Sequence, residues 1–157
     1  MSLDYKIKEI SDSNISALED LSLDALTDGH HAVEKTIKEW KDGTNSFSKN
    51  GEKLWGIFLD EKCIGIGGVM RDPFIDDPTV GRVRRVYIST KYRGLGLSKV
   101  LLRLIIEKAK KNFKTLRLST HNPVAAHLYE SFNFEKKEDE KVTHQITNLK
   151  TYILPTK

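Results

Sequence analysis

Along the first part of the chain, the spacing of hydrophobic residues changes from that of a strand to that of a helix. Residues 5–10 alternate between polar and apolar side chains, which predicts a strand. Apolar residues at helical spacing then predict two helices. The first helix ends at Gly29, and the second buries Val33, Ile37 and Trp40.

Three strand-like runs follow a polar loop at residues 43–53. The runs at 54–59 and 63–70 are joined by a short polar turn and predict a hairpin. Glycines within the second run weaken it, so we expect a bulge or a close backbone contact there. These glycines are Gly65, Gly67 and Gly68. The prolines of residues 71–79 predict a loop, and residues 81–89 form the third run.

The second half begins with a glycine-rich turn and then an apolar stripe that has a helical period. The members of the stripe are Leu97, Val100, Leu101, Leu104, Ile105 and Ala109. Residues 114–120 then predict a strand and residues 124–132 a helix. Strands from Phe134 onward and over residues 142–154 complete the pattern.

This order of elements predicts an α/β (α+β) fold in a single domain over residues 1–157. We expect a mixed, mostly antiparallel sheet of about six to seven strands flanked by about four helices. The long helix crosses over between the strands near residues 85 and 117, which predicts one parallel pair. A chain of 157 residues with 38% hydrophobic residues is long enough to form one core.

Composition narrows the expected location and redox chemistry. No apolar run is long enough for a membrane span, and residues 1–6 lack the apolar segment of a signal peptide, so we expect a cytoplasmic protein. Cys63 is the single cysteine. It has no cysteine partner for a disulfide or a zinc site, and we expect it to be a buried strand residue.

The net charge is +4, but it is unevenly distributed. Residues 82–117 hold twelve basic residues and one acid, Glu107, which gives this segment a charge of +11. The asymmetry fits a nucleic acid, an acidic membrane or a polyphosphorylated small ligand. It also fits a solvated helix face, formed by Lys99, Arg103, Lys108, Lys110 and Lys111. Nucleic acid ranks last, because the segment lacks exposed aromatic residues between its basic ones.

The glycine-rich turn covers residues 92–98. Gly94 and Gly96 let the backbone approach a ligand closely, and the first amides of the next helix are free donors at the positive end of its dipole. The turn therefore predicts a site for a phosphate or pyrophosphate. It lacks the spacing of a P-loop, and Lys99 stands where a dinucleotide fingerprint needs a third glycine.

Two motifs carry a family resemblance. Residues 93–98, Arg-Gly-Leu-Gly-Leu-Ser, resemble the coenzyme A motif of the GNAT superfamily of N-acetyltransferases, whose last position is usually Gly or Ala. Ser98 departs from that pattern but is small and keeps its amide. Residues 122–134 resemble the superfamily's later signature of Asn, Ala, Leu-Tyr and a closing Gly-Phe. Asn133 replaces the glycine and also tolerates a left-handed conformation.

The resemblance implies acetyl-CoA as a cosubstrate. Backbone amides of the turn would hold the pyrophosphate, and residues 86–88 would pair with the pantetheine arm. Tyr129 is implied as the general acid that protonates the departing thiolate. The implied cofactor-binding residues are Val86, Tyr87, Ile88, Arg93, Gly94, Leu95, Gly96, Leu97, Ser98, Asn122 and Ala125.

The general base stays open. Some family members carry a glutamate on the strand before the turn, whereas this strand carries arginines, of which Arg84 and Arg85 are expected to alternate in facing. The alternatives are Asp76, Asp77, His30, His31 and a water-mediated route. His30 and Glu34 alone do not make a metal site, so no metal is expected.

The expected activity is transfer of the acetyl group of acetyl-CoA to a primary amine of a small molecule or peptide, by direct attack in a ternary complex. The alternative is a catalytically silent coenzyme A binding module that senses or scaffolds. Tyr129 favours the enzyme, and the missing glutamate keeps the alternative open. We expect no nucleic-acid or membrane partner, and a homodimer is left open.

Overall fold

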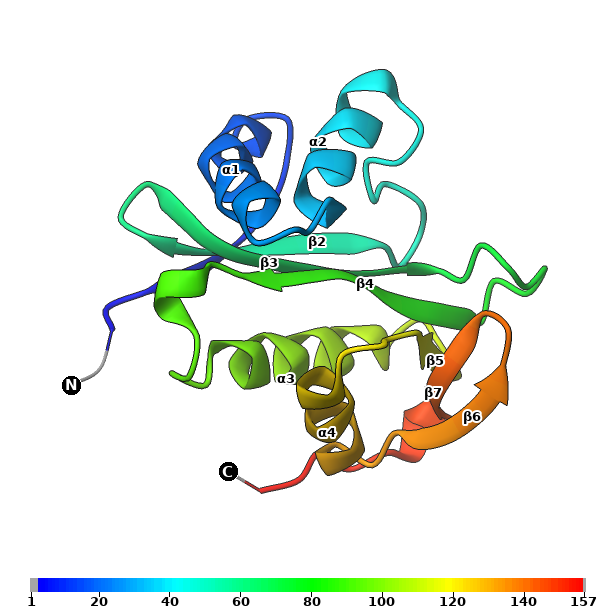
Figure 1. The fold of residues 1–157 in the computed structure, drawn as a ribbon. Helices are drawn as coiled ribbons and strands as arrows, with labels where there is room; N and C mark the ends of the chain where they lie inside the picture. Colours follow the sequence, from blue (N-terminus) through cyan, green and yellow to red (C-terminus); the bar gives the residue numbers. More distant parts are fainter. Residues whose placement is uncertain (1–2, 157) are drawn as a thin grey trace.

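The computed structural model describes residues 3–156, which form one seven-stranded sheet with helices on both faces (Figure 1). The strands are Lys6–Glu9 (β1), Lys53–Leu59 (β2), Lys62–Arg71 (β3), Val80–Ile88 (β4), Thr115–Leu118 (β5), Glu135–Asp139 (β6) and Val142–Ile146 (β7). Their order is β1-β2-β3-β4-β5-β7-β6. Only β4 and β5 pair in parallel among these strands, which confirms the predicted fold class and crossover.

Two helices lie on each face of the sheet (Figure 1). One face carries α1 (Glu19–Thr27), which begins after a 3-10 turn at Ile15–Leu18, and α2 (Ala32–Asp42). The other carries α3 (Leu97–Ala109) and α4 (Pro123–Ser131). A hydrophobic core lies on each face of the sheet, and strand β3 contributes to both. Ile64 packs on the α3 side and Ile66 on the α1 side. Burial on both faces explains the nearly continuous apolar run at residues 63–70.

The apolar stripe of α3 is broader than its sequence pattern predicted. The buried residues of this helix are Leu97, Leu101, Leu102, Ile105, Ile106 and Ala109. Val100 and Leu104 are only half-buried, although Leu104 still packs against the core. The helix packs on the sheet and also beside the end of α4, where the Arg103 guanidinium lies 5.7 Å from the centre of the Phe132 ring. A second packing partner widens the buried face.

The last predicted strand, residues 142–154, is too long. Strand β7 ends at Ile146, because Asn148 adopts a left-handed backbone (φ 54°) and a 3-10 turn follows at Leu149–Thr151. The chain beyond that turn runs back along α3 and α4. Its Tyr152 hydroxyl donates to the Phe132 carbonyl at 2.5 Å.

Strand β4 contains a β-bulge. Ile66 of β3 pairs with Tyr87, but Gly68, two residues later, pairs with Arg84, so β4 holds one extra residue between them. Arg85 lies in this bulge and has a left-handed backbone, with a φ of 63°. The glycines of β3 therefore mark bulges as predicted. One extra residue is on β4, and another is on β3 itself, where Cys63 and Gly65 pair with the consecutive residues Phe58 and Ile57 of β2. The bulge of β4 turns Arg84 and Arg85 to the same face, so the predicted alternation was wrong.

Candidate active site

The glycine turn has open space beside both of its glycines. Gly94 (φ 78°) and Gly96 (φ 80°) both have left-handed backbones, and a Cβ added at either would meet nothing within 4 Å. Gly96 directly precedes α3, and no side chain caps the helix. The first amides of α3 are therefore donors beside empty space, at the positive end of a thirteen-residue helix. This geometry suits the oxygens of a pyrophosphate.

The edge of β4 beside this turn is also open. Strands β4 and β5 pair only from Val80 to Arg82, and β4 then continues to Ile88 without a partner strand on that side in the described chain. The Ser89 amide donates to the Ile64 carbonyl of β3. Because backbone groups alternate sides along a strand, those of Ile88 and Val86 point to the open edge.

The open edge does not include every residue expected there. The backbone of Tyr87 faces β3, and its hydroxyl donates to Asp24 of α1 at 2.7 Å. The Ile88 carbonyl already accepts a bond from Arg93 Nε at 3.0 Å. The free groups of this edge are therefore the Val86 amide and carbonyl and the Ile88 amide, which can pair with an extended ligand as a strand would.

Tyr129 lies in α4, whose start follows its sequence closely. The Asn122 side chain accepts bonds from the amides of Val124 and Ala125, and Pro123 occupies the first turn. Tyr129 is buried, with 8% of its surface exposed. Burial raises the pKa of its phenol to about 12. The hydroxyl has no hydrogen-bond partner among residues 3–156, so its proton is available to a ligand.

The glycine turn, the open edge of β4 and Tyr129 lie in a part of the chain that matches a known protein family. The family model of the acetyltransferase (GNAT) family matches residues 15–134. The chain belongs to this family. Members of the family use acetyl-CoA, and the chain is accordingly an acetyltransferase. The match spans α1 to α4 and so includes the glycine turn, the open edge of β4 and Tyr129.

Solved GNAT structures share the fold. A candidate acetyltransferase from Exiguobacterium sp. 255-15 superposes with a TM-score of 0.78 at 22% identity, covering 92% of this chain and 94% of that chain. An N-acetyltransferase from Staphylococcus aureus Mu50 superposes with a TM-score of 0.70 at 19% identity, covering 92% of this chain and 98% of that chain. At these identities the similarity establishes the architecture and does not identify the acceptor.

Two aspartates, one in α1 and one at its C-cap, hold the glycine turn of this acetyltransferase in place. Asp24 accepts bonds from Tyr87 and from both the amide and hydroxyl of Thr90. Asp28 accepts from Arg93 at 2.8 Å, and the Arg93 guanidinium lies 5.2 Å from the centre of the Tyr87 ring. Arg93 thus folds back onto β4 and α1 and braces the turn.

The same contacts set the ionisation of Asp24. Its partial burial raises the pKa, but hydrogen bonds from Tyr87, Thr90 and Ser89 outweigh this effect and lower the pKa below the usual range. Partial burial and the bond to Asp24 raise the pKa of Tyr87. Neither aspartate was predicted from the sequence. Their spacing of four residues puts them on one helix face, but nothing local indicates which distant residues they meet.

The candidate bases lie in different places. Asp76 and Asp77 belong to the loop before β4, at the opposite end of that strand from the glycine turn, and Asp77 binds Thr79. His31 is exposed beside Glu34 at 3.6 Å. His30 lies 3.5 Å from Asp28 and 5.9 Å, centre to centre, from the Tyr87 ring. Among these four residues, the structure brings only His30 close to the residues that brace the turn.

Within residues 3–156, no group of three or more His, Cys, Asp or Glu side chains lies close enough to hold a metal ion. Cys63 is buried on β3, as predicted, and burial raises the pKa of its thiol to about 11. Among the same residues, no helix is long and apolar enough to cross a membrane.

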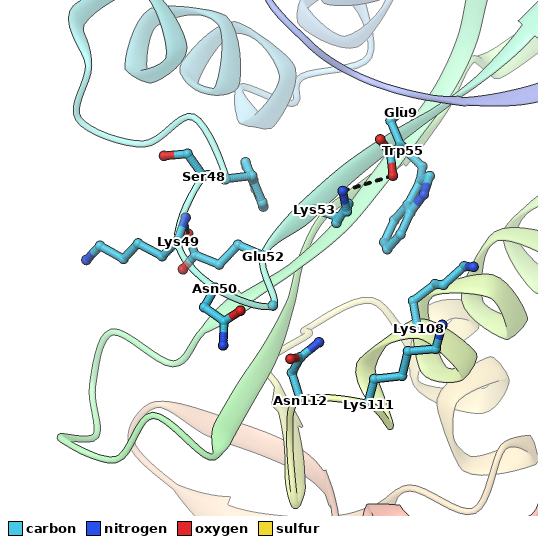
Figure 2. A pocket seen from close by; sticks show the side chains of 12 residues that line it. Glu9, Ser48, Lys49, Asn50, Glu52, Lys53, Trp55, Lys108, Lys111 and Asn112 are labelled. Carbon is cyan, nitrogen blue, oxygen red and sulfur yellow. Dashed lines mark hydrogen bonds and ion pairs between the residues drawn. The ribbon is translucent and has the colours of Figure 1, made fainter.

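The structure contains a cavity of about 520 Å³ that no residue of the glycine turn lines. Figure 2 shows the residues around it. It opens between the loop before β2 and the end of α3, where Lys108 and Lys111 line it. Its acids are already paired, since Glu9 binds Lys53 at 3.0 Å and Glu52 accepts from backbone amides. Lys108 stands eleven residues after the first residue of α3, roughly 17 Å along the helix. We assign this cavity no part in acetyl transfer.

Proposed function

We propose that this acetyltransferase transfers the acetyl group of acetyl-CoA to a primary amine of a small molecule or peptide, by direct attack in a ternary complex. The observation that carries the proposal is the junction of the open glycine turn with the unpaired edge of β4. A pyrophosphate requires clustered amide donors, and a pantetheine arm requires a free strand edge. These two features adjoin at the end of β4.

Different groups of this chain bind the pyrophosphate and the pantetheine arm of acetyl-CoA. Amides of Leu95, Gly96, Leu97 and Ser98 hold the pyrophosphate, and the Ser98 hydroxyl adds a donor. Val86 and Ile88 pair with the pantetheine. Asn122, whose side-chain oxygen caps α4, keeps its amide nitrogen for the pantetheine beside Ala125. Arg93 and Gly94 set the shape of the turn.

The transfer itself forms one bond and breaks another. The acceptor nitrogen bonds to the carbonyl carbon of the thioester as the carbon–sulfur bond breaks. A backbone amide of Val86 or Ile88 donates to the thioester oxygen, where negative charge develops. Tyr129 gives its phenolic proton to the departing sulfur, and the phenolate then recovers a proton from solvent. The proton lost by the amine leaves through water, with His30 as a further acceptor.

Binding and turnover can be tested separately. Acetyl-CoA at a hundred times its Kd should stabilise the fold by about 2.7 kcal/mol, which corresponds to a melting temperature higher by about 5–11 °C. A panel of amines scored by free thiol release then tests transfer. No thermal shift at millimolar acetyl-CoA would sink the proposal. A thermal shift without thiol release from any amine would favour the silent coenzyme A binding module.

A further inference from the structure

Arg84 is a cation without an anionic partner on the face of β4 that carries α1 and α2. It is half-buried and stands beside the bulge. The one hydrogen bond of its guanidinium within residues 3–156 is a weak contact with the sulfur of Met70, at 3.9 Å. No carboxylate of the described chain lies within 4 Å of it.

Three other arginines of this part of the sheet are paired with acids. Arg82 and Arg117 both contact Asp72, at 3.2 and 3.4 Å, and the Asp72 side chain is fully buried. Arg85 contacts Glu39 at 3.0 Å. Four guanidinium groups therefore share two carboxylates along this part of the sheet. Of the two excess positive charges, one is on Arg84 and the other is shared by Arg82 and Arg117, which contact the same carboxylate.

This arrangement is costly in the free protein. Burial, and then repulsion by Arg85 and Arg82, lower the pKa of Arg84, and the attraction of Glu39 and Asp72 does not cancel the effect. A cation withdrawn from water needs an opposite charge and hydrogen bonds to offset its desolvation. Met70 supplies neither. An anion from outside the chain would supply both.

Arg84 also lies midway along β4, near the end of the open edge that is farther from the glycine turn, where an acceptor must arrive. Under the proposed function, the cofactor runs from the glycine turn along Ile88 and Val86, so its thioester lies toward the bulge. Arg84 precedes Val86 by two residues and points to the face opposite α3. Since the pyrophosphate end lies at the start of α3, the face with α1 and α2 is the side from which an amine can approach.

We propose that the acceptor is a small amine that also carries an anionic group, a carboxylate or a phosphate, and that Arg84 binds this group. The proposal rests on the proposed function and adds the substrate class. The planar guanidinium of arginine binds either oxyanion through two parallel hydrogen bonds. Arg84 is therefore a specificity-determining residue, and it takes no part in the bond changes of the transfer.

Matched pairs of amines test the proposal with acetyl-CoA held saturating. The pairs are β-alanine and β-alaninamide, 4-aminobutyrate and butylamine, and O-phosphoethanolamine and ethanolamine. Wild-type protein should prefer the anionic member of at least one pair by about 10- to 100-fold in kcat/KM, because a charged hydrogen bond contributes roughly that much. The carboxylate and phosphate pairs show which oxyanion is bound.

Two variants isolate the role of Arg84. Arg84→Met should abolish the preference, mainly by raising KM for the anionic amine, while the Kd for acetyl-CoA stays unchanged. Arg84→Lys should restore part of the preference. Lys62→Met, which removes an exposed positive charge on β3, should keep it in full. Equal use of charged and neutral amines, or a preference that survives Arg84→Met, would overturn the proposal and leave the proposed function standing.

The free protein gives a second readout. If Arg84 exists for an anionic ligand, Arg84→Met should raise the melting temperature by about 2–4 °C, because it removes an unpaired cation from a half-buried position. A lower melting temperature would show that Arg84 serves stability, against the proposal. Acetyl-CoA binding without turnover of any anionic amine would also count against it, whereas absence of acetyl-CoA binding would sink the proposed function itself.

Discussion

Replacing Gly96 by alanine separates the folding role of the glycine turn from its role in binding. A Cβ at this position would meet nothing within 4 Å, so it causes no clash within the chain. The remaining cost is the left-handed backbone, φ 80°, which is about 1 kcal/mol less favourable for alanine than for glycine. For a chain of this length, that cost corresponds to a melting temperature lower by about 2–4 °C.

The effect on coenzyme A should be much larger. The open space beside Gly96 is where the pyrophosphate oxygens must come within hydrogen-bond distance of the α3 amides. A methyl group in that space holds the ligand away and removes at least one charge-assisted bond. Such a bond contributes about 1.5–3 kcal/mol, so the Kd of acetyl-CoA should rise by about 10- to 150-fold.

Gly43 offers a matched control for this experiment. It ends α2 with a φ of 81°, and a Cβ there would also meet nothing within 4 Å. Its helix lies on the opposite face of the sheet from α3 (Figure 1). Gly43→Ala should therefore cost the same stability and leave the Kd unchanged. Calorimetric titration with acetyl-CoA measures both variants, and an equal Kd for Gly96→Ala and Gly43→Ala would refute the pyrophosphate assignment.

Three further results should follow from the same geometry. Tyr129→Phe should lower kcat about 100-fold. The Kd for acetyl-CoA and the melting temperature should change little, since the hydroxyl has no partner in residues 3–156. The control Tyr152→Phe loses a hydrogen bond to Phe132 and should lower stability but not kcat. A pKa of about 12 keeps the Tyr129 phenol protonated, so loss of its proton should not lower kcat between pH 7 and about 10. A fall in kcat over this pH range that is absent in Tyr129→Phe would contradict the raised pKa. Asp24→Asn should cost about 1 kcal/mol in urea unfolding at pH 7, because its carboxylate is partly exposed. The lowered folded pKa means that this difference is complete above pH ~5 and shrinks as the pH falls through that pKa; a difference that persists unchanged at pH 3 would rule out the charge as its source.

Much of the fold and the first outline of the site followed from local sequence. Hydrophobic period identified most strands and helices, because it reports which face of an element is buried. Strand β6, whose five residues are all exposed, has no such period. Asn133 was expected to tolerate a left-handed backbone in place of glycine, and its φ is 67°. Asn122 and Pro123 likewise start α4 as their chemistry predicts. Each of these features depends on a few neighbouring residues.

Contacts between distant residues were not predictable in this way. Asp24 and Tyr87 are 63 positions apart, and Arg85 and Glu39 are 46 apart. Single-sequence patterns contain no record of which elements will pack together, so a surface aspartate of α1 and one that braces the turn look alike. The +11 segment shows the same limit. Arg82 and Arg85, two of its basic residues, are neutralised by acids from outside it.

The bulge of β4 is the one misread feature whose signal was present in the sequence. Strict alternation would place Arg85 with Val83, in the apolar core beneath α3, and would turn Val86 away from that core. Burying an unpaired guanidinium there would cost several kcal/mol, whereas one extra residue restores Val86 and Ile88 to the core side. Two adjacent polar positions between apolar ones, Val-Arg-Arg-Val, therefore predict a bulge in a strand that has an apolar core on one of its faces. The same extra residue brings Arg85 to the face that already carries Arg84, where Arg85 contacts Glu39. The departure from regular pairing therefore joins the fold of β4 to the proposed choice of substrate.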